Sequence, residues 1–169
     1  WGNAAQLYYS KGEYSHATKI YEELAKQESE DAKADGWRMC AGIAYSMQGD
    51  YEKAEAIQQQ CWIDQRRIYE QDPERDGRLV SKALRNLGQN AAAAKEHEKA
   101  RDYYGQCLQV IEETSEQVVS NEEKKEWIGF IRELIEELSI NSTPMLVDSQ
   151  YNIFSGHDFI PDRKAEISD

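Results

Sequence analysis

The 169-residue sequence predicts an all-α protein, built as a stack of helical hairpins that ends in a capping helix and an extended tail. The first observation is a pattern of glycine, tyrosine and small residues that recurs in three segments of the chain. The second is that large residues in each segment recur at spacings of three and four, which places them on one side of a helix. A single hairpin cannot bury its apolar side alone, so the three copies should stack.

The first copy covers about residues 1–30 and contains the turn motif KGEY. Gly12 stands where the first helix of this copy should end, a position that favours a positive φ and therefore glycine. In the second helix, Ala17 gives a small contact surface with Tyr21 beside it, which allows the two helices to interdigitate.

The second copy covers about residues 34–72 and repeats this pattern at the same offsets, with Gly49 in the turn motif QGDY. Gly42 lies in its first helix, where the absence of a side chain lets the second helix cross closely. Its second helix, AEAIQQQCWIDQRRIYEQ, is predicted to be unusually long. The matching positions are Gly42, Tyr45, Gly49, Tyr51, Ala54 and Cys61.

The third copy, about residues 79–117, is less regular. Lys95 and His97 replace the glycine and the aromatic residue of the turn, so we expect a less regular loop there. Gly88 should again mark a close helix crossing. The copy matches the others at Leu84, Leu87, Gly88, Ala91, His97, Ala100, Tyr104 and Cys107.

A capping helix is predicted over residues 121–139, with Ser120 or Asn121 as its N-cap. Its apolar residues are three and four apart, so they should cover the last repeat: Trp127, Ile128, Ile131, Leu134, Ile135 and Leu138. The tail, residues 140–169, contains two of the three prolines and loses helical periodicity. It keeps enough apolar residues that we expect it to dock somewhere.

These residues resemble the tetratricopeptide repeat family over about residues 1–139. The resemblance implies antiparallel helix pairs in a right-handed superhelix with a concave groove, and a protein-binding function as an adaptor or scaffold. The long second helices are loosely similar to the repeats of kinesin light chains and of cell-polarity adaptors, which bind extended peptides.

The family's groove positions, transferred to this sequence, give a set of candidate binding residues. They are Gln6, Tyr9 and Ser10 in the first copy, Met39, Ile43 and Met47 in the second, and Lys82, Arg85, Asn86 and Gln89 in the third. The three apolar residues either form the floor of a peptide groove beside a basic, amide-rich wall, or they are buried between the units. A clamp for a terminal carboxylate is disfavoured, because Gln6 and Ile43 occupy places where that clamp has asparagine.

The net charge of −12 disfavours nucleic acid as a ligand and favours a basic partner or one with apolar anchors. No apolar run approaches the roughly 20 residues of a membrane-spanning helix, so no membrane is expected. Three widely separated cysteines fit a reducing compartment, and we expect the protein in the cytoplasm. Because the chain begins at Trp1 without a start methionine, we expect it to be a fragment of a longer protein.

No catalytic motif is apparent, so the sequence predicts a protein that is not an enzyme and has no metal and no cofactor. Cys61 and Cys107 are expected to be small core residues. Two alternatives to a simple adaptor stay open. The tail could occupy the groove of its own chain or of a neighbouring copy and act as a regulatory switch, rather than pack along the outside, and the fragment could serve only for self-assembly.

Overall fold

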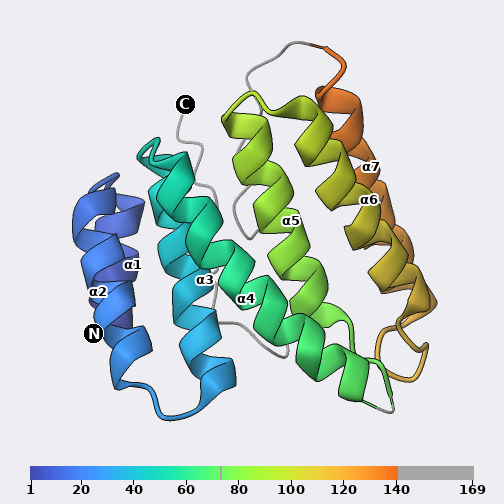
Figure 1. The fold of residues 1–169 in the computed structure, drawn as a ribbon, viewed down its shortest axis with the longest axis horizontal. Coiled ribbons are helices and arrows are strands. Elements are labelled where there is room, and N and C mark those ends of the chain that lie inside the picture. Colours follow the sequence, from blue (N-terminus) through green and yellow to red (C-terminus); the bar gives the residue numbers. More distant parts are fainter. Residues whose placement is uncertain (73, 141–169) are drawn as a thin grey trace.

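The structure is a computed structural model that describes residues 1–72 and 74–140. Over these residues it consists of seven α-helices and contains no strand (Figure 1). The helices are α1 (Gly2–Ser10), α2 (Tyr14–Gln27), α3 (Asp31–Met47), α4 (Tyr51–Gln71), α5 (Arg78–Ala93), α6 (His97–Glu113) and α7 (Asn121–Glu137). The predicted all-α stack is therefore confirmed. Among the second helices of the hairpins, α4 has 21 residues and α2 only 14, so the predicted lengthening does not extend to the first hairpin.

The helices form two layers (Figure 1). The first helices of the hairpins, α1, α3 and α5, lie in one layer, and the second helices, α2, α4 and α6, lie in the other. Within the first layer, Ser46 Oγ of α3 donates a hydrogen bond to Asn90 Oδ1 of α5 at 2.5 Å. Within the second layer, Gln59 Nε2 of α4 donates to Tyr103 Oη of α6 at 3.3 Å. Side-chain hydrogen bonds thus join the second and third repeats in both layers.

The three hairpin turns share one backbone conformation. Gly12, Gly49 and Lys95 have φ angles of 77°, 87° and 67°. In each turn the residue with positive φ donates its N–H to the carbonyl three residues earlier, as Lys95 does to Ala92 at 3.0 Å. The expectation of a less regular third loop is therefore wrong, because the surrounding helices hold a lysine in the left-handed conformation that glycine adopts without cost.

Two glycines permit the close helix crossings that the sequence predicts. A Cβ atom at Gly42 would lie 2.7 Å from Gln58 Cγ of α4. A Cβ atom at Gly88 would overlap the ring of Tyr104 in α6. In the second and third hairpins, the second helix therefore rests directly on the backbone of the first.

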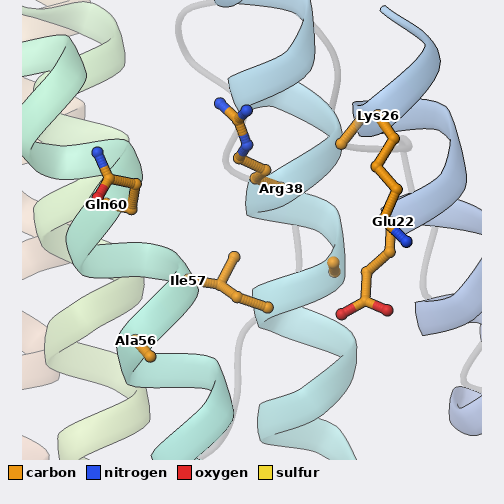
Figure 2. A pocket seen from close by; sticks show the side chains of 8 residues that line it. Glu22, Lys26, Arg38, Ala56, Ile57 and Gln60 are labelled. Atoms are coloured by element: carbon orange, nitrogen blue, oxygen red, sulfur yellow. The ribbon is translucent and has the colours of Figure 1, made fainter.

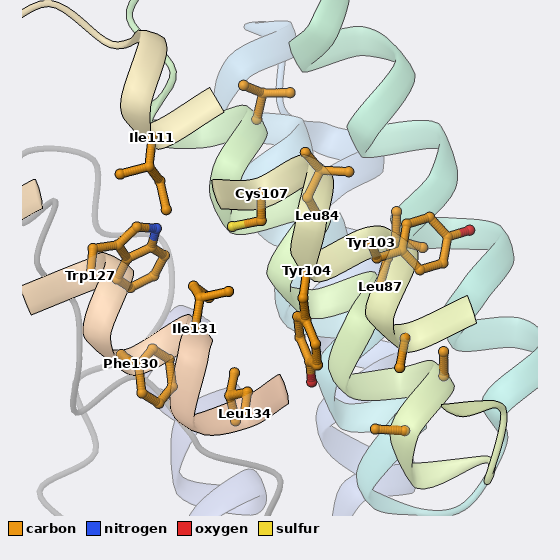
Figure 3. Packing of buried hydrophobic residues seen from close by; sticks show 14 of the residues in the cluster. Leu84, Leu87, Tyr103, Tyr104, Cys107, Ile111, Trp127, Phe130, Ile131 and Leu134 are labelled. Atoms are coloured by element: carbon orange, nitrogen blue, oxygen red, sulfur yellow. The ribbon is translucent and has the colours of Figure 1, made fainter. Parts of the chain in front are cut away.

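The apolar core is divided into two large clusters. One lies among α1, α2 and α3 and includes Tyr9 and Tyr21. The other lies mainly among α5, α6 and α7, where Trp127 and Ile131 are directed toward α6 (Figure 3). A small third cluster of buried residues lies between them, formed by Met39, Cys61 and Ala83.

The capping helix α7 begins as predicted. Ser120 is its N-cap, and a capping box joins the Ser120 side chain to the backbone N–H of Glu123 and the Glu123 side chain to the backbone N–H of Ser120. Its buried face contains Trp127, Phe130, Ile131 and Leu134, which cover the last hairpin. Except for Ile140, the predicted tail of residues 140–169 lies outside the described residues.

Candidate functional site

The residues predicted to bind a partner lie on the first-layer helices, and those of α5 form the most distinctive group. Lys82, Arg85, Asn86 and Gln89 are separated by three, one and three residues, so they share one face of the helix. All four are buried, with Lys82 1% and Arg85 2% exposed. Buried charged and amide groups in the middle of a repeat stack are uncommon, because leaving water costs free energy that specific interactions must offset.

Arg85 and Asn86 form a local hydrogen-bonded unit. Arg85 donates to Asn86 Oδ1 from both Nε, at 3.2 Å, and Nη2, at 3.0 Å. The same guanidinium lies over the ring of Trp127 in α7, 5.3 Å from its centroid. The α7 helix thus positions Arg85, a role that the sequence does not reveal because the two residues are far apart in the chain.

This arrangement orients the amide of Asn86. Its oxygen accepts from arginine, so the nitrogen Nδ2 is directed elsewhere as a donor. Asn86 is 2% exposed, and Nδ2 has no hydrogen-bond partner among the described residues. A buried donor without an acceptor costs on the order of 1–3 kcal/mol, so this nitrogen is suited to a ligand that supplies an oxygen.

Asn90, one turn further along α5, differs from Asn86 in having a structural role. Its Nδ2 donates to the backbone carbonyl of Tyr51 at 2.9 Å, and its Oδ1 accepts from Ser46. Both polar ends of the amide are therefore satisfied inside the protein. Asn86 therefore differs from Asn90 in keeping an amide nitrogen that has no hydrogen-bond partner among the described residues.

The α3 candidates divide into two environments. Met39 is buried in the small cluster with Cys61 and Ala83, between α3, α4 and α5. Ile43 and Met47 are half-buried and pack against the cluster of α1, α2 and α3. Met39 is thus a core residue, whereas the other two keep part of their apolar surface exposed.

The α1 candidates are not brought together with the polar group of α5. Tyr9 is buried and makes an edge-on ring contact with Tyr14, with ring centroids 5.3 Å apart. Gln6 is half-buried and Ser10 is exposed, on the first helix of the stack. Since α3 lies between α1 and α5, only an extended ligand could contact both helices.

The described part of the chain contains no cluster of three or more His, Cys, Asp or Glu residues suited to a metal ion. Burial raises the pKa of the Cys61 and Cys107 thiols to about 12, so neither is an activated nucleophile. Both are fully buried, and each thiol donates to a backbone carbonyl of the preceding helix. Their predicted role as small core residues is confirmed.

Sequence analysis missed the burial of Asp35 in α3. Its side chain is 1% exposed and accepts from Gln65 Nε2 of α4 at 2.8 Å. The spacing of Asp35 and Gln65 from neighbouring core positions was a signal that both face inward, but their polarity argued against it.

Among the described residues, no helix is long and apolar enough to pass through a bilayer.

Comparison with known proteins gives a family but no individual relative. Neither the curated proteins nor the solved structures yielded a match. A family model described as "Tetratricopeptide repeat" matches residues 41–113, from the middle of α3 to the end of α6. This segment contains two hairpin turns, at Gly49 and Lys95, and both glycine crossings. With its paired and layered helices, this segment of the chain is similar to the tetratricopeptide repeat family.

Proposed function

We propose that this protein binds an extended segment of a partner protein along the first-layer helices α1, α3 and α5, and so acts as an adaptor or scaffold. Repeats of this family generally mediate protein–protein interactions. The observation that supports the specific site is the buried amide nitrogen of Asn86, which is oriented by Arg85 and has no acceptor among the described residues. A carbonyl of a peptide backbone is an acceptor of the required kind.

The neighbouring side chains define the rest of the ligand. Lys82 and Arg85 give this face of α5 a local positive charge, which suits a carboxylate next to the bound carbonyl. Ile43 and Met47 offer partly exposed apolar surface on the adjacent helix, which suits an apolar anchor. Gln6 lies further along the same layer. The proposed ligand is therefore an extended peptide with one apolar side chain and one acidic side chain.

The proposed setting is the cytoplasm. All three cysteines are buried and free, a state that a reducing compartment preserves. The groove acts by recognition and not by catalysis in this proposal, since its polar groups are hydrogen-bond donors without an activated nucleophile.

The test begins with peptides selected from a random display library on the purified protein. Their dissociation constants are then measured by calorimetry for the wild-type protein, for Asn86→Ala and for the matched control Asn121→Ala on the exposed start of α7. We expect Asn86→Ala to weaken binding about tenfold, which corresponds to roughly 1.4 kcal/mol, and Asn121→Ala to leave it unchanged. Selected peptides that bind both variants with wild-type affinity would show that the groove lies elsewhere.

A second candidate is a regulated module, in which residues 141–169 occupy this groove until a partner displaces them. The segment lies outside the described residues, and the support comes from its composition. It contains aspartates that complement Lys82 and Arg85, together with apolar side chains suited to the surface near Ile43. Truncation after Ser142 separates the two roles: release of a blocked groove tightens peptide binding, whereas loss of a structural tail lowers the melting temperature without tightening it.

A further inference from the structure

The second layer contains a depression between α2 and α4, on the side of the stack opposite to the proposed peptide groove (Figure 2). It encloses about 440 Å³, which lies within the ordinary range for ligand pockets. Its floor is apolar, with Ala25 and Ala41 buried and Ile57 half-buried. Glu22, Lys26 and Arg38 supply charged groups around that floor. Figure 2 shows Ile57 extending from α4 into the space between the helices.

The next repeat contains the equivalent depression, between α4 and α6. Gly12 and Gly49 lie 37 residues apart, and so do Ala25 and Trp62. Trp62 lines the second depression, which encloses about 230 Å³. It also packs against two core clusters. The first depression is thus larger where an alanine takes the place of a tryptophan.

The contacts of Trp62 indicate what the first depression could hold. The guanidinium of Arg66 lies 5.6 Å from the centroid of the indole ring while it also pairs with Glu70 at 2.8 Å. A cation already paired with a carboxylate can therefore also lie over an indole in this protein. In the first depression, Arg38 has the same character, because it pairs with Asp35 at 2.7 Å and keeps 38% of its side chain exposed.

We propose that the depression between α2 and α4 binds the side chain of a tryptophan in a basic segment of a partner protein. The apolar floor of Ala25, Ala41 and Ile57 buries the indole ring, and Arg38 lies beside its face. Glu22 accepts from Tyr45 Oη at 2.9 Å and has a further carboxylate oxygen for the indole N–H. Basic neighbours of the tryptophan follow from the net charge of −12, which attracts cationic segments to the surface.

This proposal is independent of the peptide groove, since it uses α2, α3 and α4 from the opposite side. The probe is the tripeptide acetyl-Lys-Trp-Lys-amide, and acetyl-Lys-Ala-Lys-amide is its control. The methyl signals of Ala25, Ala41 and Ile57 are followed by NMR during titration. We expect saturable shifts with the tryptophan peptide and at least tenfold weaker binding of the alanine peptide.

Two variants close the depression in different ways. Ala25→Trp places an indole at the position that Trp62 has in the next repeat, and Ala56→Lys adds bulk and positive charge at the exposed rim. Both should weaken binding of the tryptophan peptide at least tenfold. Ala4→Lys, at an exposed alanine of α1, is the matched control for the charge change and should bind as the wild type does.

Unchanged binding by Ala56→Lys would overturn the proposal even if Ala25→Trp does not fold. Equal affinity for the two peptides would also overturn it, because the indole would then have no specific role. Sedimentation of the protein without peptide tests whether a second copy of the chain occupies the depression. A dimer that disappears in Ala56→Lys but not in Ala4→Lys would assign the depression to a second copy of the chain, against the proposed partner. Asn86→Ala should leave binding of the tryptophan peptide unchanged, which separates this site from the groove.

Discussion

The guanidinium of Arg38 lies 2.7 Å from the carboxylate of Asp35, an aspartate that is almost completely buried between α3 and α4. Burial raises the pKa of Asp35 above its usual value of 3.8, although hydrogen bonds from Arg38 and Gln65 act in the opposite direction. Burial of this carboxylate between two helices is unfavourable by itself, and the hydrogen bonds from Arg38 and Gln65 offset that cost.

Replacement of Asp35 tests this interpretation. Asp35→Ala leaves Gln65 without its acceptor and creates a cavity, so we expect a loss of about 2 kcal/mol in the free energy of unfolding, less than for a fully buried ion pair because Arg38 can reach water. Asp35→Asn keeps the volume and should cost less. Urea unfolding monitored by circular dichroism measures both, and equal losses would show that the carbonyl oxygen of asparagine cannot replace the carboxylate.

The raised pKa of Asp35 also predicts the sign of a pH dependence. Because the folded-state pKa exceeds the unfolded one, the carboxyl contributes stabilisation that is full below about 3.8 and is lost as the pH rises through the folded pKa. The wild-type protein should therefore gain stability relative to Asp35→Asn as the pH is lowered from neutral toward about 4. Parallel stability profiles for the two proteins would contradict the shift.

Gly88 and Gly105 provide a matched pair of helical glycines. A Cβ at Gly88 overlaps the Tyr104 ring, whereas a Cβ at Gly105 meets no atom within 4 Å. We expect Gly88→Ala to destabilise the protein by about 1–3 kcal/mol through overpacking. Gly105→Ala should stabilise it by about 0.5–1 kcal/mol, because glycine lowers helix stability relative to alanine. Thermal melts of the two variants should shift in opposite directions, and a common direction would refute the close crossing.

Lys95 offers a stabilising substitution. Its φ of 67° is a left-handed conformation that costs a residue with a Cβ about 1 kcal/mol. Lys95→Gly should therefore raise the free energy of unfolding by less than about 1 kcal/mol, because the greater freedom of glycine in the unfolded chain offsets part of the gain. The reciprocal change Gly49→Lys at the equivalent turn should lower it. Chemical denaturation of both variants measures these changes. If Lys95→Gly destabilises the protein, the contacts of the lysine side chain stabilise the fold by more than the left-handed backbone conformation destabilises it.

The buried thiols predict a loss of stability at high pH. Burial raises the pKa of Cys61 and Cys107 to about 12, against an ordinary value of 9.0. Since the folded-state pKa is the higher one, their stabilisation is full below about 9 and is lost as the pH rises toward about 12. The double variant Cys61→Ala, Cys107→Ala should show a flatter decline in melting temperature over this range than the wild type does. Identical declines would show that other groups are responsible.

The repeat pattern was sufficient to predict the hairpins, because Gly12, Gly49 and the small residues at the crossings have local causes. It failed at Lys95, where the fold imposes a conformation that the residue does not prefer. The spacing of Lys82, Arg85 and Asn86 predicted that they share a helix face. It could not show that Arg85 lies over Trp127, because contacts between distant segments leave no periodic signal.

The depression beside Ala25 could be predicted only in part from the sequence. The difference between Ala25 and Trp62 is visible when the repeats are aligned, but the space that results depends on how far apart α2 and α4 lie. Similarly, the inward-facing positions of α4 include Gln58 and Gln65, which hydrophobic periodicity alone would place outside. Polar residues inside the stack are the main feature that sequence reasoning missed.

The division of the apolar interior at α4 has a consequence for motion. The stripe of α4 that faces inward contains two glutamines, and among the described residues the two large clusters are separate, with the small cluster of Met39, Cys61 and Ala83 between them. The amides of α1 to α3 should therefore exchange with solvent in local openings that leave α5 to α7 closed. A peptide lying across both parts would couple them, so that occupancy at one end of the molecule becomes detectable as protection at the other.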